Sequence, residues 1–572
     1  MAKQNISFRV IFLFLCVCTF FVTSSHFVNK EILPKWYALY MLTLSGWIPL
    51  FFTAKSITIK FDRIFISLFI TIGFLLIFGS LLSTHGVSSG FLYIGFLLLF
   101  LFFKVTDRQD TGFAYITIVG TCALQAIYGI LQFFDLVGSN YSFTIVGSFD
   151  NPAGFAASLS AGFGFGFGLL GRDKRSNYIV IAAMLLIAIS TVLSQSRAGM
   201  LAIFSITCFY LYNNFSHGRF RKYKRKAFYG ILLVLLLLLS LLIFFKKDSA
   251  TGRLLIWQTT LDMIVDRPVL GWKNVSFRSQ YMLYQADFFK NSPKSSFESL
   301  ADNVSHPFNE PLLFLFQYGI VGSVLLFILI FTLFRDRGKE NFIYQLCILS
   351  ILIFGCFSYP LRYPFVWLIL VFCLARISNN STKVYGQHAM SVGPIHRTAI
   401  AAVLLPCFYF LIKDIQFEYQ WNKIARLSLS GETVRVLSQY EKLNSQWNGN
   451  PLFLYNYGAE LNVIGDYKSS NDALLHCAQY WNDFDVQMLL GANYEFLGEF
   501  ESAKKHYSLA HWMVPSKFMP LYKLVGIYKK IGQEKTAYEL AAKLYNKPVK
   551  VPSLTVDQIK QEMNRLLVDA NL

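Results

Sequence analysis

Two arginines are the residues whose types and surroundings best suit anion binding. Arg197 lies in SQSRAGM, at the end of an apolar run, where a guanidinium is costly unless it reaches water or an anion. Snorkelling toward water is common, but it leaves the neighbouring Ser196 unexplained. Arg253 lies in TGRLLIWQTTLDMIVDRPVLGW, in the expected first turn of an amphipathic helix, where a basic residue opposes the helix dipole. Anion binding would offset that cost, and an ordinary solvated arginine is the alternative.

A histidine stands in the run SHPFNEPLLFLFQYGIVG, at the mouth of a long apolar segment. A lone histidine such as His306 is more often structural or solvated than catalytic. With Asn309 and Glu310 one turn away, an imidazole that exchanges protons near neutral pH becomes a candidate base. A further polar cluster, GSFDNPAGFA, contains Asn151 and precedes GFGFGFG, whose missing side chains favour close helix packing. Taken alone, this cluster is equally well explained as a turn with a proline break.

The elements that position these clusters are expected to be membrane helices. The chain has 572 residues, of which 54% are hydrophobic and 15% charged, below the roughly one quarter of charged residues in soluble domains. Residues 228–245 carry no charge and are long enough to cross much of a hydrocarbon core. We therefore predict an all-α, polytopic bundle of about 13 spans, at 6–24, 36–53, 64–82, 89–103, 113–133, 153–170, 178–194, 198–213, 228–245, 311–334, 342–358, 361–376 and 397–412. The first is taken as an uncleaved helix rather than a signal peptide.

The net charge of +19 is explained by membrane orientation rather than by nucleic acid. Twenty-two lysines and arginines lie in the short loops on the N-terminal side, whereas the opposite short loops hold Lys30, Lys35, Arg197 and Arg362. By the positive-inside rule the N-terminus is cytoplasmic, and the long loop at about 246–310 and the tail after 413 face outward. We expect a multi-pass protein of the bacterial inner membrane with a periplasmic C-terminal domain.

The tail shows a helical repeat. One unit has tetratricopeptide offsets, at Leu490, Gly491, Tyr494, Ala503, Tyr507, Ala510 and Pro515, and Gly465, Gly498 and Gly532 recur at 33 and 34 residues. We predict a membrane domain at 1–413 and a repeat domain at 414–572, whose concave surface would suit a protein partner. Eight of the nine cysteines fall in apolar stretches, so neither a disulfide framework nor a metal site is predicted, and no cofactor is expected.

Taken in order, the four clusters resemble the O-antigen ligase and polymerase superfamily, which includes protein O-oligosaccharyltransferases. The resemblance covers about 147–325. It implies the transfer of a glycan from an undecaprenyl-diphosphate carrier, on the periplasmic side, to lipid A core, another glycan or protein. Because no acidic pair or metal-ligand cluster recurs on the outer side, we expect a metal-independent reaction. Arg197 and Arg253 match the arginines that hold the diphosphate, and a guanidinium fork suits phosphate oxygens better than an ammonium does. Ser196, Asn151, Asn309 and Glu310 are then candidate substrate-binding residues.

The base is the least well matched position. Counting back from Gly319 places Asn309 correctly, but Phe308 occupies the position of the family's histidine, and His306 lies two residues early. Either Pro307 bends the segment so that His306 reaches the same space, or the protein uses another base or none. Within the enzyme class, O-antigen ligation, protein O-glycosylation and glycan polymerisation all remain open. A lipid-linked glycan transporter or flippase is the alternative from another class, although neither midplane charges nor inverted repeats are apparent.

Overall fold

The computed structural model describes residues 2–53, 56–78, 89–106, 111–138, 143–171, 174–215, 230, 247–273, 275–293, 295–336, 338–381, 384–391, 393–447 and 449–570. The predicted span at 228–245 lies outside the described residues, Gly230 excepted.

The chain forms two compact units. The membrane unit comprises Met1–Phe245, Phe308–Phe314 and Ile320–Tyr419. The loop–repeat unit comprises Lys246–Pro307, Leu315–Gly319 and Gln420–Leu572. The long loop therefore groups with the C-terminal helices, whereas its sequence position assigned it to the membrane domain. The boundary near residue 413 stays a prediction; the helix α15 (Pro394–Leu427) runs through it without a break.

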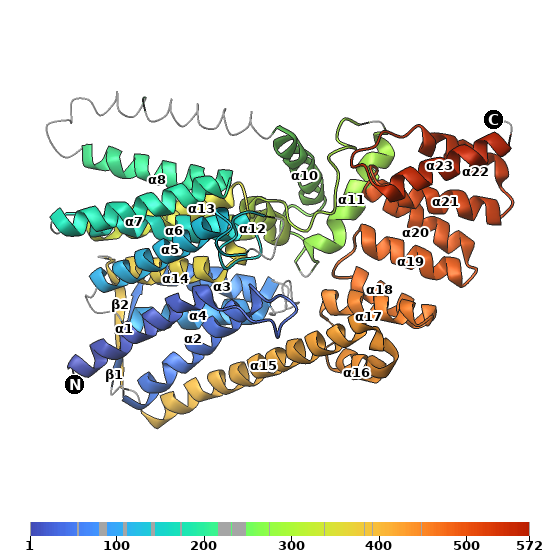
Figure 1. Cartoon of the computed structure of the whole chain (residues 1–572). Coiled ribbons are helices and arrows are strands. Elements are labelled where there is room, and N and C mark those ends of the chain that lie inside the picture. The colour runs from blue at the N-terminus through green and yellow to red at the C-terminus, as the bar shows by residue number, and fades with distance from the viewer. Residues whose placement is uncertain are drawn as a thin grey trace. The chain divides into compact units, whose positions relative to one another are not determined.

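Helices occupy the other twelve predicted spans, as Figure 1 shows by colour along the chain. In chain order they are α1 (Ala2–Cys18), α2 (Leu33–Thr53), α3 (Arg63–Phe78), α4 (Ser89–Val105), α5 (Thr111–Phe133), α6 (Pro152–Leu169), α7 (Lys174–Leu193), α8 (Arg197–Phe215), α12 (Glu310–Arg335), α13 (Phe342–Gly355), α14 (Pro364–Asn379) and α15. The turn η4 (Pro360–Arg362) joins α13 to α14.

Within the described residues, four helical segments are long and apolar enough to cross a membrane: Thr111–Phe133, Lys174–Leu193, Glu310–Arg335 and Arg397–Gln446. Shorter apolar helices lie at Val10–Phe21, Arg63–Phe78, Tyr93–Val105 and Pro364–Asn379. The protein is thus a multi-pass membrane protein, while the number of thirteen spans stays a prediction.

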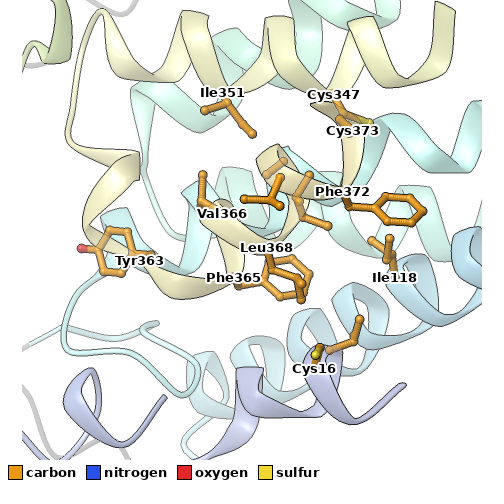
Figure 2. Packing of buried hydrophobic residues seen from close by; sticks show 14 of the residues in the cluster. Cys16, Ile118, Cys347, Ile351, Tyr363, Phe365, Val366, Leu368, Phe372 and Cys373 are labelled. Atoms are coloured by element: carbon orange, nitrogen blue, oxygen red, sulfur yellow. The ribbon is translucent and has the colours of Figure 1, made fainter. Parts of the chain in front are cut away.

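The glycines of α6 let three neighbouring helices approach closely, as the sequence predicted. A Cβ at Gly162 would lie 2.5 Å from Cys122 Sγ, and one at Gly164 would lie 2.8 Å from Cys347 Sγ. These contacts bring α6 against α5 and α13, and Gly166 does the same against α7. Figure 2 shows side chains of α1, α5, α13 and α14 converging in the same apolar core. Close packing of this kind replaces the hydrophobic driving force that is missing between helices in lipid.

A two-stranded antiparallel sheet interrupts the helical pattern, and the sequence did not predict it. Strand β1 (Ser56–Asp62) pairs with β2 (Val384–Ser391) from Ser56↔Ser391 to Asp62↔Val384. At its end, buried Asp62 accepts hydrogen bonds from Lys104 Nζ at 2.9 Å and from Ser378 Oγ at 2.6 Å. Because an unpaired charge would be costly there, this ion pair joins β1 to α4 and α14.

The loop–repeat unit is helical. Its loop carries α10 (Lys247–Asp266) and α11 (Phe277–Asn291), and its C-terminal part carries α16 (Thr433–Gln446), α17 (Pro451–Val463), α18 (Tyr467–Ala478), α19 (Phe484–Phe496), α20 (Phe500–Met513), α21 (Met519–Lys530), α22 (Glu534–Tyr545) and α23 (Leu554–Asp569). Three antiparallel pairs, α17 with α18, α19 with α20 and α21 with α22, form what we call the repeat array (Figure 1). The repeated glycines fit this arrangement: Gly465, Gly498 and Gly532 have φ of 85°, 77° and 76° at the turn inside each pair.

Candidate functional site

Arg253 lies on α10, in the loop–repeat unit. The helix begins at Lys247, so Arg253 stands in its second turn and the expectation of a first-turn position is wrong. The side chain is half-buried. Trp257 follows four residues later, and residues four apart share one face of a helix. The neighbours of Trp257 therefore indicate what the Arg253 face of α10 packs against.

The neighbour of Trp257 is the segment that carries His306. Trp257 Nε1 donates a hydrogen bond of 2.9 Å to the carbonyl oxygen of buried Pro307. His306 precedes that proline in an irregular stretch, where it is half-buried. The structure thus holds the helix face of Arg253 against the chain at His306. Phe308, which belongs to the membrane unit, adopts a left-handed φ of 52°, a sharp bend directly after the proline.

Two motif glycines join the third and fourth clusters through their backbones. Gly271 has φ of 66°, and Gly319, with φ of 61° and ψ of −163°, breaks the regular geometry of α12. A Cβ on Gly271 would lie 2.6 Å from the carbonyl of Gln317, and one on Gly319 would lie 2.4 Å from the carbonyl oxygen of Val269. Both positions therefore require glycine, for their conformation and for the close approach.

Hydrogen bonds complete this junction. The amide of Trp272 donates to Phe316 O at 2.9 Å, and that of Lys273 donates to Gln317 O at 3.0 Å. The Trp272 ring stacks on Phe316 at 5.7 Å between centroids, and its indole donates to Met263 O at 2.7 Å. The C-terminal end of α10 is thus fixed to the segment 316–319. This contact sets the position of α10, and with it the position of Arg253, within the loop–repeat unit.

Arg197 is the first residue of α8, in the membrane unit. Before it, Gln195 takes a left-handed φ of 56°, and Ser196 Oγ accepts a hydrogen bond of 3.4 Å from Gly199 N. Ser196 therefore acts as a helix cap, which explains the polar run beside Arg197. A helix N-terminus directs amide N–H groups and positive potential outward, so an anion meeting the half-buried Arg197 would also meet this field.

Asn151 and Asn309 have structural partners in the membrane unit. Asn151 caps α6, because its Oδ1 accepts from Gly154 N at 3.0 Å. Asn309 caps α12 in the same way, accepting from Leu312 N at 3.0 Å. Both motifs thus place a helix start, and each asparagine is followed by a proline in the first turn.

The turn η4 brings the first and fourth clusters together, and sequence reasoning missed its role. Tyr363 OH donates to Asn151 Oδ1 at 3.1 Å, and Glu310 Oε1 accepts from Leu361 N at 3.3 Å. Arg362, which the sequence registered only as one of four outward charges, pairs with Asp150 at 3.4 Å. Burial raises the pKa of Asp150, and the positive charge of Arg362 opposes that rise. The signal available in the sequence was the polar run SYPLRYP between two apolar helices.

The predicted site residues therefore divide between the units. Asn151, Ser196, Arg197, Asn309 and Glu310 belong to the membrane unit, whereas Arg253 and His306 belong to the loop–repeat unit. Among the residues described, no group of three or more His, Cys, Asp or Glu side chains is placed to hold a metal ion.

Comparison with known proteins gives one informative match. A search of curated proteins finds none. Among solved structures, "MamA RS-1 ArsTM double mutant" is 17% identical, covering 30% of this chain and 90% of that chain with a TM-score of 0.23. "Crystal structure of APC/C hetero-tetramer Cut9-Hcn1" is 10% identical, covering 93% and 83% with a TM-score of 0.22. Scores this low carry no argument about fold or function.

The informative match is to a family model. Residues 182–328 match the family described as O-Antigen ligase. The matched segment contains Arg197, Arg253 and His306 and both glycines of the backbone junction, while the GSFDNPAGFA cluster precedes it. The match supports a likeness of this segment to the O-antigen ligase and polymerase superfamily.

Proposed function

We propose that this protein is a membrane glycosyltransferase that moves a glycan from an undecaprenyl-diphosphate carrier to an acceptor hydroxyl at the periplasmic face of the inner membrane. The observation that carries the proposal is the hydrogen bond from Trp257 to Pro307, inside the O-antigen ligase domain. It holds a helix face bearing an arginine against a segment bearing a histidine. An anion-binding group and a group able to accept a proton are the two that this transfer needs.

The chemistry follows from the roles of these groups. The acceptor oxygen attacks the anomeric carbon of the glycan, and the bond from that carbon to the diphosphate oxygen breaks. The diphosphate leaves with the electron pair, so its negative charge grows, and the guanidinium groups of Arg253 and Arg197 stabilise it. His306 takes the proton of the acceptor hydroxyl. The reaction is proposed to be metal-independent. The starts of α6, α8 and α12 are proposed to contact the substrate, and the residues that shape them are Asn151, Ser196, Asn309 and Glu310.

The nature of the acceptor is a separate part of the proposal. The repeat array favours transfer to protein, or a protein partner of an O-antigen ligase, because such arrays present extended binding surfaces. Glycan polymerisation uses the same donor and the same leaving group, so it is the runner-up. A lipid-linked glycan flippase would form no new glycosidic bond, and the O-antigen ligase domain favours an enzyme over it.

A deletion strain tests the proposal. Lipopolysaccharide, free polymer and glycoproteins are compared after complementation with the unmodified protein, Arg197→Ala, Arg253→Ala and the control Arg267→Ala. Arg267 is exposed, follows α10 directly and lies over the Trp272 ring at 4.3 Å, so its loss removes an arginine of the same region and one contact of the junction, but neither of the two proposed phosphate-binding groups. Complementation should restore one of the three products. We expect each site variant to lower transfer by about a hundredfold or more at unchanged abundance. Normal transfer by both would refute the proposal.

A further inference from the structure

One buried amide joins the long loop to the repeat array. Gln285 on α11 has no solvent exposure. Its Nε2 donates to Met513 O, at the end of α20, at 2.6 Å and to Asp302 O at 3.2 Å. Its Oε1 accepts from Tyr281 OH at 3.0 Å. Every polar atom of this side chain is therefore used, and the side chain connects α11, the chain that leads to His306, and the repeat array.

An apolar cluster covers the same region and reaches the arginine helix. Buried Leu255 of α10, Phe289 of α11 and Ala301 pack together, and Trp512 of α20 packs against them. Leu255 lies two residues from Arg253. A displacement of α20 would thus be transmitted to α10 through side chains in direct contact, since packed interiors transmit strain rather than absorb it.

A second set of polar contacts fixes the loop nearer to the histidine. Asn303, three residues before His306, donates from Nδ2 to Asp485 Oδ2 at 3.0 Å and accepts from Phe484 N at 3.2 Å, both at the start of α19. The amide of Asn482 also donates to Arg278 O on α11 at 3.1 Å. The turn before α19 and the end of α20 therefore both hold the loop.

We propose that the repeat array is a positioning device for the transfer reaction, with Gln285 and Asn303 as positioning residues that act through α10 and the chain at His306. The inference rests on the proposed function and goes beyond partner recruitment, the role that the sequence suggested for this domain. Ordering a residue costs conformational entropy. A loop ordered in advance by the array avoids that cost when the donor binds and keeps the reacting groups in place.

The test uses the full-length protein in cells and, after purification, hydrogen exchange. Gln285→Leu keeps the size of the side chain and leaves two carbonyl oxygens without their donor, the buried one of Met513 and the partly buried one of Asp302. We expect it to lower transfer by about tenfold or more, as when a side chain that holds a functional group in place is lost. Exchange should increase in 251–257 and 301–307 but not in α21 and α22. The same substitution at exposed Gln479 in the repeat array is the control and should leave both readouts unchanged.

Exchanging the amide of Asn303 with the carboxylate of Asp485 distinguishes a loss of positioning from a failure to fold. Asn303→Asp sets two carboxylates against each other and should lower transfer several-fold. Adding Asp485→Asn restores a donor and an acceptor with the roles reversed and should recover transfer to within about twofold of the unmodified protein, because contacting residues are coupled. Full activity in Gln285→Leu and Asn303→Asp, with Arg197→Ala and Arg253→Ala inactive, would overturn the positioning role alone. Full activity in the arginine variants would overturn the proposed function instead.

Discussion

In the membrane unit, the polar motif residues bond to backbone: Asn151 and Asn309 cap helices, and Glu310 accepts from the turn before α14. In the loop–repeat unit, Arg253 is instead carried on a helix face that Trp257 fixes to the chain beside His306. The motif residues of the membrane unit thus shape helix ends, whereas the motif residues of the loop–repeat unit are placed by a neighbouring side chain. A motif points to a family, whereas the hydrogen bonds of Asn151 and Asn309 show that these two motif positions build helix starts.

The largest effect on stability is expected at the backbone junction of Gly271 and Gly319, inside the loop–repeat unit. Gly271→Ala or Gly319→Ala would force a left-handed alanine and a Cβ within 2.6 Å of backbone atoms. We expect a loss of about 3 kcal/mol, as for other strained backbone positions, seen as lower abundance and a lower Tm of the purified protein.

Gly526→Ala is the matched control for the junction, because a Cβ there meets nothing within 4 Å and the residue lies inside α21. It should be neutral or stabilise the protein by up to about 1 kcal/mol. Equal losses of stability in all three variants would show that the two glycines of the junction are no more constrained than Gly526.

A smaller, pH-dependent effect is expected in the loop–repeat unit. Burial lowers the pKa of His506 to about 4 and that of His511 to about 3, from ordinary values of 6.5. In the unfolded chain both take a proton as the pH falls through about 6.5, whereas in the folded chain they stay neutral until much lower pH. The unfolded state then binds more protons, so stability is lost as the pH falls from 7 to 4, by on the order of 2 kcal/mol for each histidine at pH 5.

Melting curves of the purified protein at pH 7.5 and 5 measure this loss. The double variant His506→Gln/His511→Gln should show a smaller drop in Tm between the two pH values. An identical drop would assign the pH dependence to other groups.

The smallest effects are expected at the helix caps, and they sharpen the comparison most. Asn151→Ala and Asn309→Ala should each cost about 1 kcal/mol, whereas the serine variants retain a capping oxygen and most of that stability. Transfer should follow stability in all four. A serine variant that melts normally but transfers nothing would make that asparagine a substrate ligand rather than a cap.

Much of this architecture could be predicted from composition and spacing. Apolar runs predicted the positions of twelve described helices, and repeated glycines predicted the helix pairs, because both depend on local sequence. The pairing of β1 with β2 could not be predicted, since it joins segments more than 300 residues apart with no strong strand pattern. The role of Arg362 was missed for the same reason: its partner Asp150 is distant in sequence.

The site was predicted unevenly. Arg253 and His306 were identified by motif, but their common location depends on the hydrogen bond from Trp257 to Pro307, which no motif indicated. Gln285 carries no motif at all. Its importance follows only from its three partners on segments 17, 4 and 228 residues away.

The central claim is that guanidinium forks hold the donor's diphosphate, and binding of undecaprenyl diphosphate to the purified full-length protein tests it most directly. Affinity is measured for the unmodified protein, Arg253→Lys and Arg197→Lys, with Arg267→Lys as the control. Because an ammonium keeps the charge but loses the bidentate geometry, we predict at least about tenfold weaker binding for the two site variants and unchanged binding for the control. Equal affinity in all four proteins would contradict the account.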